Sequence, residues 1–237
     1  MLRYLIFLFL PFAIQAQIVT DYYPNGNKKF LGKKVDGIED STWMFWYENG
    51  QISAIIHYDM GEIDGKFEYF GSNGLLSQRG FQKDGLPYDT LSNFYPHGPI
   101  RDQTVFVNGS KNGLYREWYP EGGLRLSVPY IDNLIEGEKL FYYESGKLCY
   151  SKSYRKGADN GPTIYYDPSG KKLWEGIFAD GVREGLCKSY HKNGNIESTG
   201  RFSNDLMEGE WIYYNESGKI IKREFYEKGV LTGTKSR

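Results

Sequence analysis

Histidine and cysteine side chains supply most metal sites and many nucleophiles, and this chain of 237 residues has three histidines and two cysteines. His57, His97 and His191 take three different positions relative to a regular series of glycines described below. At least one whole period separates them, so they do not have the spacing of a zinc ligand set. Neither Cys149 nor Cys187 has a histidine at a plausible strand offset. These residues predict neither a metal site nor a thiol nucleophile.

Serine and carboxylate side chains are more numerous but no better arranged for catalysis. Ser110 and Ser127 lack the strand–turn–helix context of a nucleophile elbow. Glu68, Glu117 and Glu138 each have a lysine or arginine neighbour, as in a solvated cross-strand ion pair. We therefore expect no catalytic, cofactor-binding or metal-binding residue, and a protein that is not an enzyme. A hydrolytic pair of acids brought together from two repeats stays open as an alternative.

Tyrosine provides the best candidate for a binding surface. Three residues before each glycine of the series stands a row that is rich in tyrosine in its first six copies and polar in its last three. Side chains alternate along a strand, so we expect this row on the face opposite an aromatic row one residue earlier. Exposed aromatic side chains often anchor protein partners, and their rings can also stack on sugars. The candidate partner-binding residues are Tyr47, Tyr95, Tyr119 and Tyr143. The alternative is that these tyrosines only cover the second face of a one-layer sheet.

The glycine series sets the architecture that must position these side chains. Nine glycines stand 24 residues apart without an insertion or deletion: Gly26, Gly50, Gly74, Gly98, Gly122, Gly146, Gly170, Gly194 and Gly218. A fixed period of this length indicates a tandem repeat array, in which each unit packs only on its neighbours. We call these residues the anchor glycines and give other positions relative to them.

Aromatic and aliphatic side chains occupy fixed positions in each repeat. Four residues before the anchor, all nine residues are aromatic, and eight residues after it seven of nine are. Two residues after the anchor, seven are isoleucine or leucine. Such residues favour a pleated, half-buried surface, so the sequence predicts two short strands per repeat.

Further glycines predict the turns that join the strands. Asparagine precedes the anchor in several copies, and Asn-Gly predicts a hairpin turn in which both residues are left-handed. A second glycine follows eleven residues after the anchor, replaced only by Asn133 and Asp205, which also tolerate a left-handed backbone. A third glycine, fifteen residues after the anchor, is expected to close this second turn.

Two prolines interrupt the pattern near the fourth repeat. Pro87 lacks a backbone donor, Asp89 replaces the third glycine, and Pro99 follows the anchor Gly98. Because proline in a sheet is confined to edges, bulges and strand starts, we expect an irregular segment at 85–103, with a bulge or a widened loop. A hydrolase site hidden in this segment is the third functional hypothesis.

The first sixteen residues do not share the repeat. Arg3 precedes an apolar run from Tyr4 to Ile14, and Ala16 offers a cleavage site. This run is shorter than the roughly 20 residues of a membrane-spanning helix, so we expect a signal peptide at 1–16. The repeat array then covers 17–237, with no integral membrane segment after cleavage, and the protein is exported to the periplasm, the cell surface or the medium.

Charge and cysteine positions narrow the partners. Lysine and arginine number 29 and aspartate and glutamate 30, with the signs interspersed, so nucleic acid is not an expected partner. Cys149 and Cys187 fall about three strands apart, roughly 14 Å, which is too far for a disulfide. We expect a protein partner, with a polysaccharide as the alternative.

The motif Gly-x-Trp-x-x-Tyr-x-x-x-Gly, clear from Gly209 to Gly218 and echoed from Gly113 to Gly122, resembles the MORN repeat and more closely its bacterial variant. The resemblance covers about residues 20–233. It implies an all-β fold, an elongated single antiparallel β-meander sheet built from tandem hairpins. Some bacterial members carry an antitoxin-like label, and other members are scaffolds or are suspected of lipid binding.

Together these features predict an exported, non-enzymatic repeat scaffold that presents a long β surface for protein–protein interaction. The alternative function is binding of cell-wall or other polysaccharide through an exposed tyrosine row.

Overall fold

The computed structural model describes residues 15–236, and the signal peptide expected at 1–16 lies almost entirely outside this range. Every regular element in the described range is a β-strand. The part of the chain that the structure describes contains no helix long and apolar enough to cross a membrane. The chain divides into two compact units between Leu86 and Pro87, which we describe separately.

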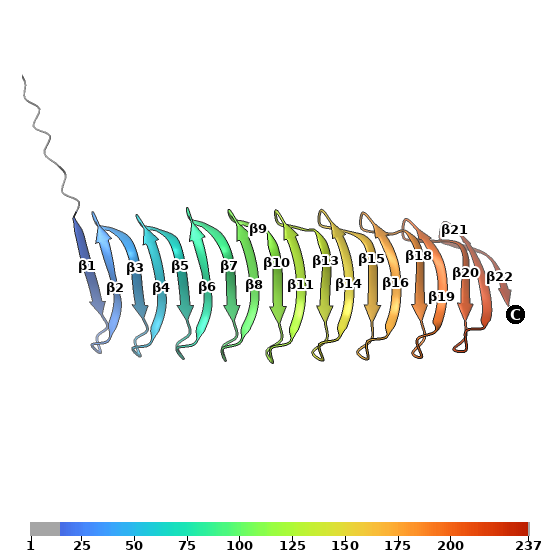
Figure 1. Cartoon of the computed structure of the whole chain (residues 1–237), viewed down its shortest axis with the longest axis horizontal. Coiled ribbons are helices and arrows are strands. Elements are labelled where there is room, and N and C mark those ends of the chain that lie inside the picture. Colours follow the sequence, from blue (N-terminus) through green and yellow to red (C-terminus); the bar gives the residue numbers. More distant parts are fainter. Residues whose placement is uncertain (1–14, 237) are drawn as a thin grey trace, which may run out of the picture. The chain divides into compact units, whose positions relative to one another are not determined.

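The first unit is an antiparallel meander in which each strand pairs with the next one along the chain (Figure 1). Its strands are β1 (Ala16–Tyr22), β2 (Lys28–Val35), β3 (Ile38–Trp46), β4 (Ile52–Asp59), β5 (Glu62–Phe70) and β6 (Leu76–Lys83).

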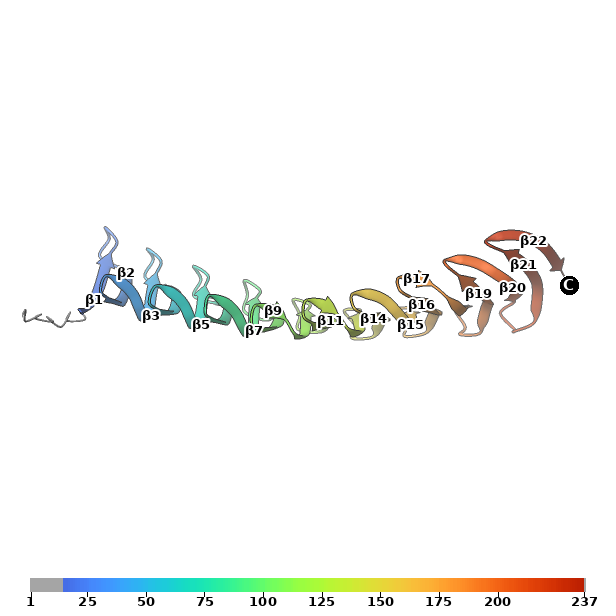
Figure 2. The ribbon, with the colours of Figure 1, turned by 90° about the horizontal axis from the view of Figure 1, so that it is seen from above.

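The second unit continues the same pattern of antiparallel hairpins. Its strands are β7 (Leu86–Phe94), β8 (Ile100–Val107), β9 (Ser110–Lys111), β10 (Gly113–Trp118), β11 (Leu124–Ile131), β12 (Leu134–Ile135), β13 (Gly137–Tyr142), β14 (Leu148–Arg155), β15 (Ala158–Tyr166), β16 (Lys172–Ala179), β17 (Val182–Arg183), β18 (Gly185–Tyr190), β19 (Ile196–Ser203), β20 (Leu206–Tyr214), β21 (Ile220–Glu227) and β22 (Val230–Ser236). The strands of this unit are bowed, as β19 and β21 show in Figure 2. The predicted all-β antiparallel meander of hairpins is confirmed.

The register gives the sheet of each unit two different faces. Trp43 pairs with Ile56 and Phe45 pairs with Ala54, so these four side chains share one face, which we call the packed face. Trp43, Ile56 and Ala54 are buried there, and in the second unit Trp211 and Cys187 are buried at the position of Trp43. The packed face therefore carries the core of each unit, although the described residues of each unit form a single layer of sheet.

Glycine makes room for tryptophan on the packed face. A Cβ atom built on Gly200 would lie 2.1 Å from the Trp211 ring, and one built on Gly32 would lie 2.0 Å from the Trp43 ring. Both glycines stand six residues after an anchor, and each indole belongs to the following repeat. Trp211 also contacts Phe202 and Tyr226 edge-on, which links three adjacent strands.

The turn at the anchor glycine differs from the predicted one. In all nine copies the glycine N–H donates to the carbonyl three residues earlier at 2.8–2.9 Å, and the glycine has a positive φ. The preceding asparagine has no positive φ, so the expectation that both residues are left-handed there is wrong. The asparagine is selected by its side chain instead: Asn49 Oδ1 accepts from Gln51 N, and its Nδ2 donates to Ser72 O in the next repeat.

The pair of left-handed residues lies at the other end of the hairpins. The residue ten after each anchor has a φ of 46–50°, and the residue after it is also left-handed. Asn133 and Asp205, which replace glycine there, have φ values of 67° and 65°, as the sequence predicts. Their side chains accept hydrogen bonds from the N–H groups of Lys111 and Arg183 in the preceding repeat.

The third glycine has a different place from the expected one. Gly65 has a φ of 113° and lies inside β5, where the pairing with β4 shifts between Ile56 and Tyr58. It therefore forms a bulge within the strand rather than the end of the turn. In several copies of the second unit this bulge interrupts the strand, which is why β9, β12 and β17 are short.

The proline-containing segment 85–103 holds a hairpin like the others. β7 has nine residues, as do β3 and β5, and its pairing with β8 shifts between Asn93 and Phe94, as in every repeat. Asp89 has a φ of 60° at the shared bulge position. Pro87 occupies the repeat position of Lys111 and Arg183, whose backbone N–H groups donate to a side chain of the next repeat. The residue at the acceptor position opposite Pro87 is Gly109, which has no side chain, so the proline removes no such hydrogen bond.

Candidate binding surface

The predicted tyrosine row lies at the ends of strands. Tyr47 follows the last residue of β3 and opens the anchor turn: its N–H donates to Gln51 O, and its carbonyl accepts from Gly50 N. Tyr95, Tyr119 and Tyr143 make the same two backbone bonds in their own repeats. The row therefore belongs to the turns and not to a strand face, which corrects the expected alternation.

The tyrosine hydroxyls connect neighbouring repeats. Each donates to the backbone carbonyl of the aromatic residue at the end of a strand 23 positions later, at 2.7–2.9 Å. The donors and acceptors are Tyr23 and Trp46, Tyr47 and Phe70, Tyr95 and Trp118, Tyr119 and Tyr142, and Tyr143 and Tyr166. Tyr47, Tyr95, Tyr119 and Tyr143 are half-buried, so the row is less exposed than predicted.

Other residues in this row replace the tyrosine in two ways. His191 Nε2 lies 2.8 Å from Tyr214 O and makes the same connection to the next repeat. Asp167 and Asn215 instead accept hydrogen bonds within their own turns, from Ser169 and Ser217 respectively. Eight of the nine copies thus fix the anchor turn through this side chain, by one route or the other, and the third copy has Gly71 there.

The structure keeps the four candidate tyrosines apart. Tyr95 stacks on His97 with ring centroids 5.5 Å apart, and the Arg125 guanidinium lies 5.9 Å from the Tyr119 ring. Among the described residues no ring contact joins one candidate tyrosine to another. A structural function is therefore established for the hydroxyls, while partner binding by the rings stays a prediction.

A group of aromatic side chains on the packed face of the second unit does come together. Phe141 and Tyr150 stack with ring centroids 5.3 Å apart, and the contacts continue from ring to ring at 5.9, 6.0 and 6.4 Å. The members are Phe141, Tyr150, Tyr165, Trp174 and Phe178, which we call the aromatic ladder. All five are half-buried and come from four successive long strands, β13 to β16.

A lysine lies inside the ladder. Lys152 Nζ is 6.0, 5.7 and 5.9 Å from the ring centroids of Tyr150, Tyr165 and Phe178, and 3.6 Å from Asp159 Oδ2. Burial favours the neutral amine, but contacts with Tyr165 and Asp159 outweigh it and raise the pKa of Lys152. Burial and a hydrogen bond with Asp159 likewise raise the pKa of Tyr154. At neutral pH the ladder therefore surrounds a positive charge.

The ladder was not predicted from the sequence, because each aromatic residue was compared with residues at the same position of other repeats and not with the residue opposite it in its hairpin. Residues five before an anchor lie opposite residues four after it, as Phe141 does with Tyr150 and Tyr165 with Trp174. The first position is aromatic in five of nine copies and the second in three, so combining the two positions with the hairpin register would have predicted the cluster.

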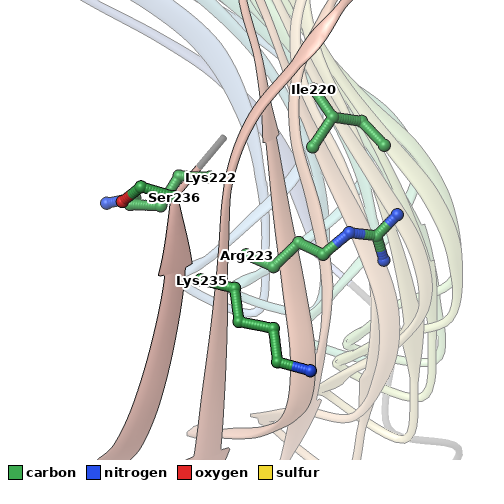
Figure 3. Close-up of a pocket in the computed structure, with 5 residues that line it drawn as sticks. All are labelled: Ile220, Lys222, Arg223, Lys235 and Ser236. Atoms are coloured by element: carbon green, nitrogen blue, oxygen red, sulfur yellow. The ribbon is translucent and has the colours of Figure 1, made fainter.

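The hollows of the described surface are shallow. One of about 330 Å³ lies at β21 and β22, where Arg223 and Lys235 point to one side and Lys222 and Ser236 to the other (Figure 3). Arg223 forms an ion pair with Glu210 and Lys222 with Glu224, so two of the three cations of this hollow already have a counter-ion. A second, apolar hollow of about 250 Å³ is lined by Pro162, Ile164, Ile177 and Leu186 on the opposite face.

The residues considered for chemistry remain dispersed. His57 lies beside Thr42, at 3.2 Å, and His97 and His191 contact backbone carbonyls of the following repeats. Within the described residues no group of three or more histidine, cysteine, aspartate or glutamate side chains could hold a metal ion. Cys149 and Cys187 are both free thiols.

The sequence of the chain matches a family model described as the MORN repeat variant. The matches cover residues 39–60, 111–132, 135–156, 183–204 and 207–228. All five begin thirteen residues after an anchor glycine, so they share one phase of the 24-residue period. No curated protein sequence matches the chain. Five matches in one register, on hairpins that repeat the same turns and bulge, identify the chain as a MORN-repeat protein.

Proposed function

We propose that the protein is an exported, non-enzymatic scaffold that binds another protein through the packed face of its second unit. The observation that carries this proposal is the aromatic ladder around Lys152. Half-buried aromatic rings in mutual contact provide rigid area that loses little side-chain entropy on binding, and such residues dominate the energetics of protein interfaces. A MORN-repeat sheet is a scaffold, and the ladder is where this scaffold concentrates anchoring side chains.

Glu175 lies beside Lys188 on the opposite face of β16, and its carboxylate is paired rather than available for catalysis. Glu175 is engaged by Lys172 at 2.6 Å, by Tyr190 at 2.6 Å and by Lys188 at 3.5 Å, and the first two contacts lower the pKa of its carboxyl group. A carboxylate held in this state is a poor general acid at neutral pH. Export rests on the apolar run that precedes the repeats, and residues 1–16 are its proposed signal.

Polysaccharide binding through the tyrosine row has less support. The hydroxyls of Tyr47, Tyr95, Tyr119 and Tyr143 already donate to backbone carbonyls, so a sugar would have to displace those bonds or use only the ring faces. We keep it as the second outcome of the experiment below.

Site-specific photo-crosslinking tests the proposal. A photoreactive amino acid at position 165 samples the ladder, and one at Leu186, which is 64% exposed on the opposite face, is the matched control. We expect a protein crosslinked from position 165 and not from 186, identified by mass spectrometry and then purified. Tyr150→Ala with Tyr165→Ala should abolish its binding to the purified chain, while Leu186→Ala should not.

The folding of each variant is checked by circular dichroism before binding is compared. Equal crosslinking from both positions, or unchanged affinity of the folded double variant, would contradict the packed face as the interface. Binding on a glycan array without any crosslinked protein would favour the polysaccharide alternative.

A further inference from the structure

Two lysines face each other on the packed face at a place where the two hairpins compared below have uncharged residues. Lys139 of β13 and Lys152 of β14 are directly opposite partners. The same pair of positions holds Trp43 and Ile56 in one hairpin, and Cys187 and Gly200 in another. Like charges directly opposite on one face destabilise a sheet. The sixth repeat therefore carries a charge pair that its own folding does not explain.

The two lysines differ in their surroundings. Lys152 is balanced by Asp159 and by the rings of the ladder. Lys139 is half-buried and makes no ion pair, side-chain hydrogen bond or ring contact among residues 15–236. A half-buried cation without a counter-ion is costly, and an incoming anion would recover that cost.

The neighbours of Lys139 restrict what the anion can be. Phe141 and Tyr150 stand two positions away on the same two strands, with stacked rings. Their faces are already approached by cations: the Arg125 guanidinium is 5.6 Å from the Phe141 ring, and Lys152 is 6.0 Å from the Tyr150 ring. A sugar ring would compete with these cations for the ring faces. Arg125 already pairs with Glu117 and Lys152 with Asp159, so the unpaired Lys139 is the cation that attracts a carboxylate most strongly.

We propose that Lys139 and Lys152, beside the stacked pair Phe141 and Tyr150, bind a carboxylate in an acidic segment of a protein partner. This inference rests on the proposed function, because it assigns the chemistry of the partner that the packed face binds. The carboxylate takes the place of the missing counter-ion of Lys139, and the rings of the ladder pack against the apolar stem of the acidic side chain. Specificity comes from the sixth repeat, since the other hairpins named above lack the lysine pair.

Fluorescence anisotropy with the purified protein tests this assignment. The probes are a labelled decapeptide of glutamate, a decapeptide of glutamine of equal length, and labelled polygalacturonate as an acidic polysaccharide. Lys139→Met removes the charge and keeps the length of the side chain. Lys188→Met is the matched control, because Lys188 lies on the opposite face and is paired with Glu175.

We expect the glutamate peptide to bind, the glutamine peptide not to bind, and Lys139→Met to weaken the glutamate complex about tenfold or more. The melting temperature of Lys139→Met should stay or rise, because a repulsion in the free protein is removed. An unchanged or higher melting temperature distinguishes a binding residue from one that only supports the fold. Lys188→Met should leave the affinity for the glutamate peptide unchanged.

Three results overturn the assignment. The first is that the glutamate peptide does not bind up to millimolar concentration. The second is that Lys139→Met and Lys188→Met lose affinity for this peptide to the same extent. The third is that polygalacturonate binds through Lys139 while the glutamate peptide does not bind. Failure here leaves the crosslinking experiment at position 165 unaffected, so the acidic chemistry and the protein-binding function are judged separately.

Discussion

At the scale of single residues, tyrosine has two different uses in this chain. The hydroxyls at the anchor turns are donors to the next repeat, while Tyr150 and Tyr165 use their rings on the packed face. The same residue type, at different positions of the repeat, therefore serves the fold in one case and the candidate surface in the other.

Tyr119→Phe isolates the first use. The Tyr119 hydroxyl donates to Tyr142 O at 2.7 Å, and its loss leaves that carbonyl of a half-buried strand end without this donor. We expect the free energy of unfolding to fall by about 1 kcal/mol, measured by urea denaturation. Tyr88→Phe is the control, because Tyr88 is 44% exposed in the same unit. Equal stability of the two variants would show that the hydroxyl contributes nothing.

At the scale of elements, the strands and turns were predicted only from the position of each residue relative to the anchor glycine. The two assignments that were wrong, the anchor turn and the third glycine, have one physical cause. The rows of aromatic and aliphatic residues predicted two strands per repeat, and Asn133 and Asp205 correctly indicated a left-handed position. The anchor turn and the third glycine were misassigned because a glycine reports backbone freedom without saying whether it serves a turn or a bulge. That distinction depends on which residues pair across the hairpin.

The packing of tryptophan on glycine between adjacent strands belongs to the same scale. Gly200 has an ordinary φ, so alanine is acceptable to its backbone, but the added Cβ would lie 2.1 Å from the Trp211 ring. We expect Gly200→Ala to lower the free energy of unfolding by about 1–3 kcal/mol through overpacking. In the control Gly123→Ala the nearest atom would be 3.8 Å away, and urea denaturation should show little change. A loss of similar size in both would indicate a general intolerance of alanine.

At the scale of the whole molecule, the period specifies the fold far better than it specifies the binding surface. Every repeat must satisfy the same turns, so the shared residues are recoverable from one sequence. A binding site depends on residues that depart from the repeat pattern, such as Lys139 opposite Lys152. The effect of such a residue cannot be inferred until the strand register shows which residue lies opposite it. The paired phases that form the ladder were present in the sequence, but only the structure showed that they share a face.

The many tyrosines also give the molecule a specific response to alkaline pH. Burial, followed by the nearby carboxylates Glu117 and Asp102, raises the pKa of Tyr115 to about 12. Burial and a hydrogen bond to Glu175 raise the pKa of Tyr190 to about 12. In the unfolded chain a tyrosine has a pKa of about 10. Because the folded pKa is the higher one, this contribution to stability is complete below pH ~10 and is lost progressively up to pH ~12.

We therefore expect urea midpoints that are constant between pH ~7 and pH ~10 and fall steadily above pH ~10. Tyr190→Phe tests one contribution, since phenylalanine keeps the ring but does not titrate. Its alkaline decline should be shallower than that of the unaltered protein, whereas Tyr88→Phe should leave the slope unchanged. An alkaline decline as steep in Tyr190→Phe as in the unaltered protein would contradict the raised pKa of Tyr190.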